Sequence, residues 1–191
     1  DSVSKFCLSD YDFETRMKSV QSEKGHNEEH WKLFAELGWL AIPFAEEHGG
    51  LDGNDVDLSL MFEEFGKAIV VEPYLANVVL GGGILKRSDL EDRSKYIEGI
   101  ISGESQISLA NYEPTKGFNL GNVDCEISSD GNVNGLKTTV LNAQNANYFV
   151  VFGKQGNSYA FALVSKDAEG LDCTSYKTYD GFVSGDVKFN N

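Results

Sequence analysis

The sequence predicts an α+β protein in which an all-α helical half, residues 1–103, precedes a small antiparallel β-barrel, residues 104–191. Before residue 104, apolar residues recur every three or four positions, as they do on a helix with one buried face. After it, apolar and polar residues alternate, as they do on a strand with one buried face. With 191 residues, the chain is long enough for two small domains.

The clearest helical pattern covers residues 55–69, where one face is apolar and Asp55 is the expected N-cap. That face consists of Leu58, Met61, Phe62, Phe65, Ala68 and Ile69. Other helices are expected within residues 2–22, from Asn27 to Pro43, from Glu72-Pro73 onward, and after a capping box of Ser88 and Glu91. Gly81, Gly82 and Gly83 follow the helix that begins at Glu72-Pro73, where they either cap it or let another backbone or a ligand come close.

The second half begins with residues 107–119, which predict a strand that ends at Glu113-Pro114 and a turn at Gly117. A loop at such a junction is a common place for a small-molecule site. Alternation at Val123, Cys125 and Ile127 predicts the next strand, and Asp130-Gly131 predicts a two-residue type I′ turn. Further strands are expected at residues 133–140, 148–152, 159–164 and 183–189.

The composition argues against several classes of partner. A net charge of −14, with no arginine after Arg93, disfavours binding to nucleic acid. Three scattered cysteines are too few for a disulfide framework, and they favour a cytoplasmic location. No apolar run approaches the roughly 20 residues that a membrane span requires, so membrane insertion is not expected.

A metal site is not expected either. His26 and His30 stand four residues apart, as two ligands on one helix would. Asn27 occupies the place of the glutamate that a zinc protease requires, so a solvated helix start is the favoured interpretation.

Four stretches resemble motifs of the acyl-CoA dehydrogenase family, in the same order along the chain. Residues 36–51 are similar to its ELG-hydrophobic-PEE-GG signature, and residues 63–66 resemble its EELG helix. Glu113-Pro114 falls where its TEPxxGSD flavin loop would be, and residues 135–142 resemble its GxKxWITN strand. The resemblance therefore extends over the whole chain.

The resemblance implies the chemistry of this family, in which a glutamate base removes a proton beside the thioester carbonyl and FAD accepts the β-hydride. It also implies an acyl-CoA substrate, a homo- or hetero-oligomer with another such subunit, and an electron-transfer flavoprotein as acceptor. The family base lies in a C-terminal helical domain, which is absent here because it would begin after Asn191. No catalytic residue is therefore assigned, and the chain alone is expected to be inactive.

The register of the motifs also implies site residues. The implied FAD site consists of Leu109, Asn111, Tyr112, Thr139, Val140 and Leu141, and the implied substrate channel of Tyr74, Val78, Gly82, Leu85 and Phe118. Several positions depart from the family pattern: Tyr112 replaces a threonine, Phe118 a serine, Thr139 an aromatic residue and Leu141 a hydroxyl residue.

Three functions stay open. The first is a FAD-binding part of a dehydrogenase, and the second is a structural subunit without flavin that completes a partner's FAD and substrate sites. A self-contained acyl-thioester-binding module is the third. Residues 72–74 and 109–114 look most like the small subunits of heteromeric bacterial enzymes that act on pimeloyl-CoA or sterol side chains.

Overall fold

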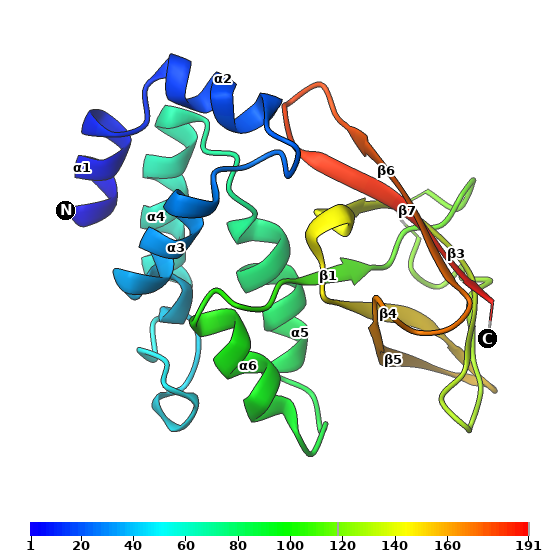
Figure 1. Ribbon diagram of the computed structural model, residues 1–191. Coiled ribbons are helices and arrows are strands. Elements are labelled where there is room, and N and C mark those ends of the chain that lie inside the picture. The colour runs from blue at the N-terminus through cyan, green and yellow to red at the C-terminus, as the bar shows by residue number, and fades with distance from the viewer. Residues whose placement is uncertain (118, 191) are drawn as a thin grey trace.

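The computed structural model describes residues 1–117 and 119–190, and it confirms a helical half followed by a sheet (Figure 1). The helices are α1 (Ser2–Ser9), α2 (Phe13–Gln21), α3 (Glu28–Glu36), α4 (Asp55–Ala68), α5 (Gly82–Leu85) and α6 (Arg93–Ile101). Short 3₁₀ segments are η1 (Trp39–Ala41), η2 (Glu46–His48) and η4 (Ala143–Asn145), and η3 (Leu75–Gly81) is π-helical. The strands are β1 (Ile107–Ala110), β2 (Glu126–Ile127), β3 (Val133–Leu141), β4 (Tyr148–Gln155), β5 (Ser158–Ser165), β6 (Leu171–Lys177) and β7 (Val183–Asn190).

Helices α2, α3 and α4 begin where a side chain accepts a backbone N–H. Asp12 accepts from Thr15 at 2.8 Å, and the predicted start of α3 at Asn27 is confirmed, with its Oδ1 2.9 Å from the nitrogen of Glu29. In α4 the cap is Asn54 rather than the predicted Asp55, because Asn54 and Asp57 bond to each other's backbone N–H.

Three helix boundaries differ from the prediction. Helix α3 ends at Glu36 rather than Pro43, because Gly38 adopts a left-handed conformation with φ of 73°. The helix expected from Glu72-Pro73 starts later and is π-helical over its first seven residues. The predicted capping box of Ser88 and Glu91 is wrong. The Ser88 hydroxyl donates to the carbonyl oxygen of Leu85, and α6 begins only at Arg93.

The sheet follows the order β1-β4-β2-β3-β7-β6, with β5 on the other edge of β4. Its pairings are mainly antiparallel, but β1 and β2 each run parallel to β4. The turn between β2 and β3 is longer than the predicted two residues, since Ile127 pairs with Val133 and residues 128–132 form the loop. A type I′ turn needs two residues of positive φ, and only Gly131 has one in this loop.

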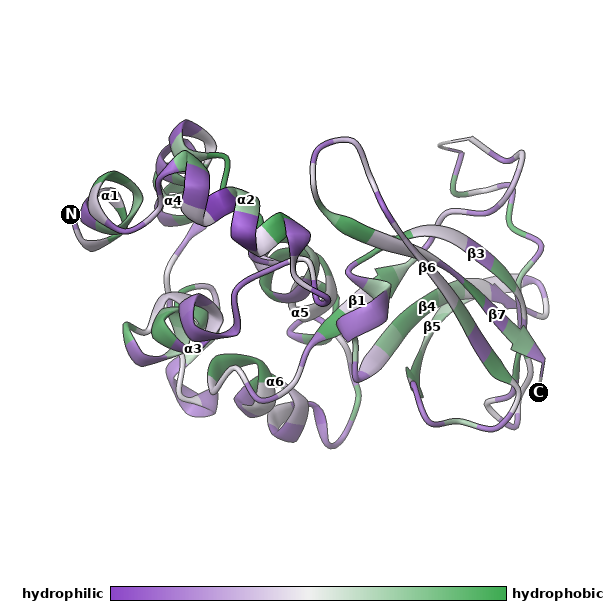
Figure 2. Ribbon diagram, turned by 45° about the horizontal axis from the view of Figure 1, so that its top comes forward, coloured by the Kyte–Doolittle hydropathy of each residue, from purple (hydrophilic) through white to green (hydrophobic). Residues whose placement is uncertain are grey.

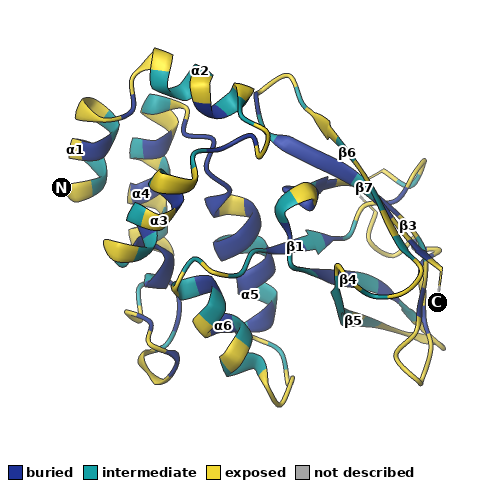
Figure 3. Cartoon of the chain, in the orientation of Figure 1, coloured by how far each residue is buried: buried dark blue, intermediate teal, exposed yellow. Residues whose placement is uncertain are grey.

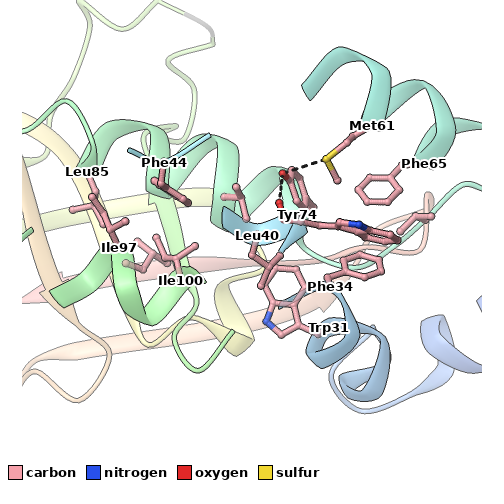
Figure 4. Close-up of a cluster of buried hydrophobic side chains, with 14 of the residues drawn as sticks. Trp31, Phe34, Leu40, Phe44, Met61, Phe65, Tyr74, Leu85, Ile97 and Ile100 are labelled. Atoms are coloured by element: carbon pink, nitrogen blue, oxygen red, sulfur yellow. Dashed lines mark hydrogen bonds between the residues drawn. The ribbon is translucent and has the colours of Figure 1, made fainter. Parts of the chain in front are cut away.

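Two hydrophobic clusters hold the fold together, as the dark blue segments of Figure 3 indicate. In the first, the ring of Phe34 stacks on Phe65 at a centroid distance of 5.5 Å and lies 4.8 Å from Trp39 (Figure 4). The second cluster fills the sheet. The first cluster includes Ile107 and Val150 from the strands, so packing is continuous across the predicted boundary at residue 104, which stays a prediction.

The helices show hydrophobic bands beside hydrophilic ones in Figure 2, as amphipathic elements over a shared core do. Burying one large apolar side chain contributes roughly 1.5–3 kcal/mol. The two halves are also joined by polar contacts, in which side chains of β6 and η4 donate to backbone carbonyls at the end of α2 and in the loop that follows it. These bonds run from Lys177 to Val20 at 2.6 Å, from Gln144 to Glu23 at 2.7 Å and from Asn145 to Lys24 at 2.9 Å.

Of the three glycines, Gly81 lets another backbone approach closely, which is one of the two predicted roles. A Cβ on Gly81 would lie 2.5 Å from the carbonyl oxygen of Ile107, whereas a Cβ on Gly83 would meet nothing nearer than Arg87 at 3.8 Å. Helix η3 therefore packs directly on β1.

We expect Gly81→Ala to destabilise the protein by about 1–3 kcal/mol, because the new methyl group would collide with backbone. Gly83→Ala should be neutral or stabilising by up to about 1 kcal/mol, because alanine favours the helix and has room. Urea unfolding followed by circular dichroism measures both. Equal effects of the two substitutions would contradict this account of the packing.

Candidate functional site

The structure brings together two segments that the sequence placed in one site. The loop after β1 lies beside the middle of β3, because the carbonyl oxygen of Tyr112 accepts the N–H of Thr138 at 2.9 Å. The Lys137 ammonium also lies 3.5 Å from the carbonyl oxygen of Asn111. The candidate FAD residues on β1 and on β3 are thus neighbours, although they are almost 30 positions apart.

A buried ion pair fixes this arrangement. Lys137 is 0% exposed, and its ammonium lies 2.7 Å from Oε1 of Glu113. The Glu113 carboxylate also accepts the backbone N–H groups of Asp124 and Cys125 at 2.6 and 2.9 Å. Both partners are therefore hydrogen-bonded within the protein, as buried charges must be.

The sequence contained both halves of this pair, but we did not predict their contact. The available signal was a lysine at position 137, in register with the buried Val133 of an alternating strand. A charge at an inward position requires a partner, and Glu113 lies in the loop that resembles a family motif.

Burial alone would raise the pKa of Glu113. The hydrogen bond from Lys137, together with the N–H groups of Asp124 and Cys125, outweighs burial and holds its pKa below the ordinary value of 4.5. Glu113 is therefore ionised at neutral pH.

Some backbone N–H groups of β1 point away from β4, the strand with which β1 pairs. The N–H of Ile107 points away from β4, since it donates to the side-chain oxygen of Asn77 at 2.8 Å. N–H groups two residues apart on a strand point the same way, so the N–H of Leu109 also points away from β4. Because β1 ends the strand order, this donor faces an open edge of the sheet.

Strand β3 is irregular where the other candidate residues lie. Its register against β7 shifts between Lys137 and Val140, and Thr139 has a left-handed φ of 54°. Val140 is buried at 1% exposure, Leu141 is half-buried, and Thr139 is exposed. The bulge therefore places neighbouring side chains in different surroundings.

The candidate channel residues form a separate group within the helical core. Tyr74, Val78 and Leu85 are buried there, and a Cβ on Gly82 would lie 2.6 Å from the Phe44 ring (Figure 4). Burial raises the pKa of Tyr74, whose hydroxyl donates to the carbonyl oxygen of Trp39 at 2.9 Å. Phe118 lies outside the described residues, and the channel role of all five stays a prediction.

Two features connect the candidate flavin residues with the candidate channel residues. Asn77 in η3 bonds the backbone on either side of residue 106, donating to Ser105 and accepting from Ile107. A mainly apolar cavity of about 120 Å³ lies between Leu141 and the start of η3, where Pro73 and Leu75 line it. Leu141 thus lies beside the start of η3, and Leu109 packs against the core cluster that contains Tyr74, Val78 and Leu85.

The histidines do not form a metal site. His26 is 3% exposed rather than solvated as predicted, since it packs against Trp31. Nδ1 of His30 lies 3.3 Å from Glu72. In the described part of the chain, no three His, Cys, Asp or Glu side chains gather as a metal ion would require. None of the described helices is long and apolar enough to cross a membrane.

Comparison with known proteins identifies the family. The model of the acyl-CoA dehydrogenase N-terminal domain matches residues 1–104. The chain belongs to the acyl-CoA dehydrogenase family. A curated relative, the probable acyl-CoA dehydrogenase YngJ of Bacillus subtilis, is 31% identical over 157 residues, which are 76% of this chain and 41% of YngJ.

Solved acyl-CoA dehydrogenase structures share the fold of this chain. The ChsE4-ChsE5 complex from Mycobacterium tuberculosis matches with a TM-score of 0.87 at 22% identity, over 99% of this chain and 52% of its match. An acyl-CoA dehydrogenase from Bacillus anthracis, complexed with FAD, matches with a TM-score of 0.86 at 22% identity, over 99% and 34%. This member of the family spans about half or less of the proteins it matches.

We expect Lys137→Met to destabilise the protein by about 3–5 kcal/mol, because it leaves the Glu113 carboxylate buried without its cation. Adding Glu113→Gln should recover part of this loss, since it removes the unpaired buried charge and its amide oxygen can still accept one of the two N–H groups that the carboxylate accepts. Denaturant unfolding of both variants measures the coupling. Additive losses in the double variant would contradict a direct pairing.

Stability should also fall in acid. A carboxyl group whose pKa is depressed in the folded state stabilises the protein above its unfolded pKa, and this contribution disappears as the pH falls through the folded value. We therefore expect the contribution of Glu113 to be complete at neutral pH and to be lost below pH 4.5. The free energy of unfolding measured against pH, for the wild type and for Glu113→Gln, should converge at low pH.

Proposed function

We propose that this chain forms the helical and β-barrel part of a flavin-dependent acyl-CoA dehydrogenase, which oxidises the α,β bond of an acyl-CoA thioester. The observation that carries the proposal is the contact between the loop after β1 and the bulge of β3, held by the Glu113–Lys137 pair. These are the two segments that resemble the flavin-contacting motifs. The family membership and the FAD complex of the Bacillus anthracis relative support it.

The residues present fit a flavin. The edge of a flavin ring offers carbonyl oxygens and ring nitrogens, which require N–H and O–H donors. Leu109 offers a backbone N–H on a strand edge that no described strand pairs with, Asn111 an amide and Tyr112 a hydroxyl, while the half-buried Leu141 offers apolar surface. Bound FAD would supply the hydride acceptor, and these residues would orient the ring and exclude water from one side of it.

The acyl group would lie toward η3 and α5. In the proposal, these residues bind the acyl group: Tyr74, Val78, Gly82 and Leu85, which limit the depth of the channel, and Phe118. The enzyme would act in the cytoplasm in fatty acid β-oxidation, assemble with a like or unlike subunit, and deliver electrons to an electron-transfer flavoprotein. The two-protein ChsE4-ChsE5 relative supports a heteromeric assembly, in keeping with the resemblance to small subunits.

A second function is a structural subunit that holds no flavin and completes the FAD and substrate sites of a partner. The observation that favours it is that the backbone N–H groups of the β3 bulge are already bonded within the chain and are not available to a flavin. The N–H of Thr138 donates to Tyr112, and the N–H of Thr139 donates to Asp186. Leu141 also has no hydroxyl where the family motif has one.

FAD content separates the two functions. The chain is purified alone and after co-expression with an acyl-CoA dehydrogenase subunit of the same organism, and FAD released by acid is measured in each sample. A flavin-binding chain should carry stoichiometric FAD in both samples, and the assembled enzyme should be reduced anaerobically by an acyl-CoA. A structural subunit should contain FAD only in the co-expressed sample. Absence of FAD from both samples would contradict both functions.

We also expect Leu141→Thr to tighten FAD binding by about fivefold, since it restores one hydrogen-bonding group worth about 1 kcal/mol. Leu136→Thr, on the same strand but outside the candidate site, is the matched control. Fluorescence titration with FAD measures both variants. An unchanged affinity in Leu141→Thr would place position 141 outside the flavin contact.

A further inference from the structure

The backbone of β3 is held in an unfavourable conformation by a residue outside both candidate groups. Thr139 is β-branched and exposed, yet its φ of 54° lies in the left-handed region that such residues rarely adopt. Asn142, three residues later, is also left-handed, with φ of 59°. Backbone outliers of this kind persist only where surrounding contacts enforce them, and they gather at functional sites.

The register of the sheet shows how the bulge arises. Lys137 pairs with Val187 and Val140 with Gly185, so that two residues of β3 lie opposite the single residue Asp186 of β7. This is the geometry of a β-bulge. In Figure 1, β3 and β7 run side by side here, and β6 borders β7.

Asp186 accepts the N–H of Thr139, which the bulge leaves out of the strand pairing with β7. Its Oδ1 accepts the N–H of Thr139 at 3.2 Å and the hydroxyl of Tyr176 on β6 at 3.0 Å. The other bulge donor, the N–H of Thr138, is accepted by Tyr112 in the loop after β1. Both N–H groups of the bulge are therefore satisfied, one through a carboxylate and one through the candidate flavin loop.

The bulge decides which side chains face the candidate site. Regular pairing would shift β3 by one residue, and such a shift moves every later side chain to the opposite face of the sheet. Val140 is now in the core and Leu141 lines the cavity beside Pro73. Without the bulge, these two residues would exchange their surroundings.

We propose that Asp186 is a positioning residue for the flavin site. Its carboxylate, oriented by Tyr176, holds Thr139 in the left-handed conformation and so sets the direction in which Thr139 and Leu141 face the flavin. This inference rests on the proposed function, because it assigns Asp186 a role in that same site.

The test combines amide exchange with FAD binding, using the chain in whichever form, alone or co-expressed, holds FAD. Asp186→Ala should speed hydrogen exchange at Thr139 and weaken FAD binding by about tenfold or more, as expected when a hydrogen bond to a charged group is lost. Asp186→Asn keeps an acceptor oxygen and should lose less, and Tyr176→Phe should also have a smaller effect. Asp172→Ala, an exposed aspartate on β6, is the matched control and should leave both readouts unchanged.

A rescue separates positioning from a general loss of stability. In the Thr139→Gly background, adding Asp186→Ala should cost much less FAD affinity than it does in the wild type, because glycine adopts a positive φ without the steric penalty that threonine has. The reference is the Thr139→Gly variant itself, since this substitution also removes the Thr139 side chain from the candidate site. A general loss of stability would leave the effect of Asp186→Ala equal in the two backgrounds. If Asp186→Ala does not fold, the Asp186→Asn and Thr139→Gly pair gives the same comparison.

The outcomes are distinguishable. Unchanged FAD affinity in both Asp186 variants, or an effect of Asp186→Ala that is as large in the Thr139→Gly background as in the wild type, overturns the role of Asp186 while the proposed function stands. If the wild type binds no FAD in either form, the proposed function fails and the flavin role of Asp186 fails with it. Amide exchange at Thr139 in the flavin-free chain then reports separately whether Asp186 holds the bulge.

Discussion

The pairing of Lys137 with Glu113 inside the sheet determines where the loop after β1 can lie. A buried lysine without a partner would be strongly destabilising, so the loop must return over β3 to deliver its carboxylate. The same carboxylate collects the N–H groups of Asp124 and Cys125 and thus starts the path into β2. Buried ion pairs add little net stability compared with apolar packing. Here the pair instead specifies a single arrangement of three segments that are distant in the sequence.

The general architecture was predictable because it depends on periodicity. The stripe at Met61 and Phe65 and the alternation at Val123 to Ile127 each reflect one buried face, which the sequence records directly. Segment ends were less predictable, since they depend on single backbone conformations. Asn54 and Asp55 are equally good caps by type, and only the bond to Asp57 distinguishes them. The parallel pairing of β1 with β4 depends on long-range topology, which no local pattern contains.

Some residues of the candidate site could be predicted from the sequence, and others could not. The motif register located Leu109 and Leu141, and the structure brings their segments together through Tyr112 and Thr138. The register could not indicate Asp186, because its contact with Thr139 crosses 47 residues and depends on a bulge. Side chains that hold the backbone of another strand have no local signature. A bulge itself is equally hidden, since Thr138 and Thr139 look like ordinary strand residues.

The polar contacts between the two halves have a further consequence. Lys177, Gln144 and Asn145 all donate to main-chain carbonyls of residues 22, 23 and 24, and none of these bonds uses a side chain of the receiving loop. Every amino acid offers the same carbonyl, so this loop can exchange its side chains without losing the contacts. Inserting or deleting one residue would move all three acceptors out of reach. The three accepting positions are therefore constrained in spacing rather than in residue type, and homologous chains should vary at these positions by substitution and not by insertion or deletion.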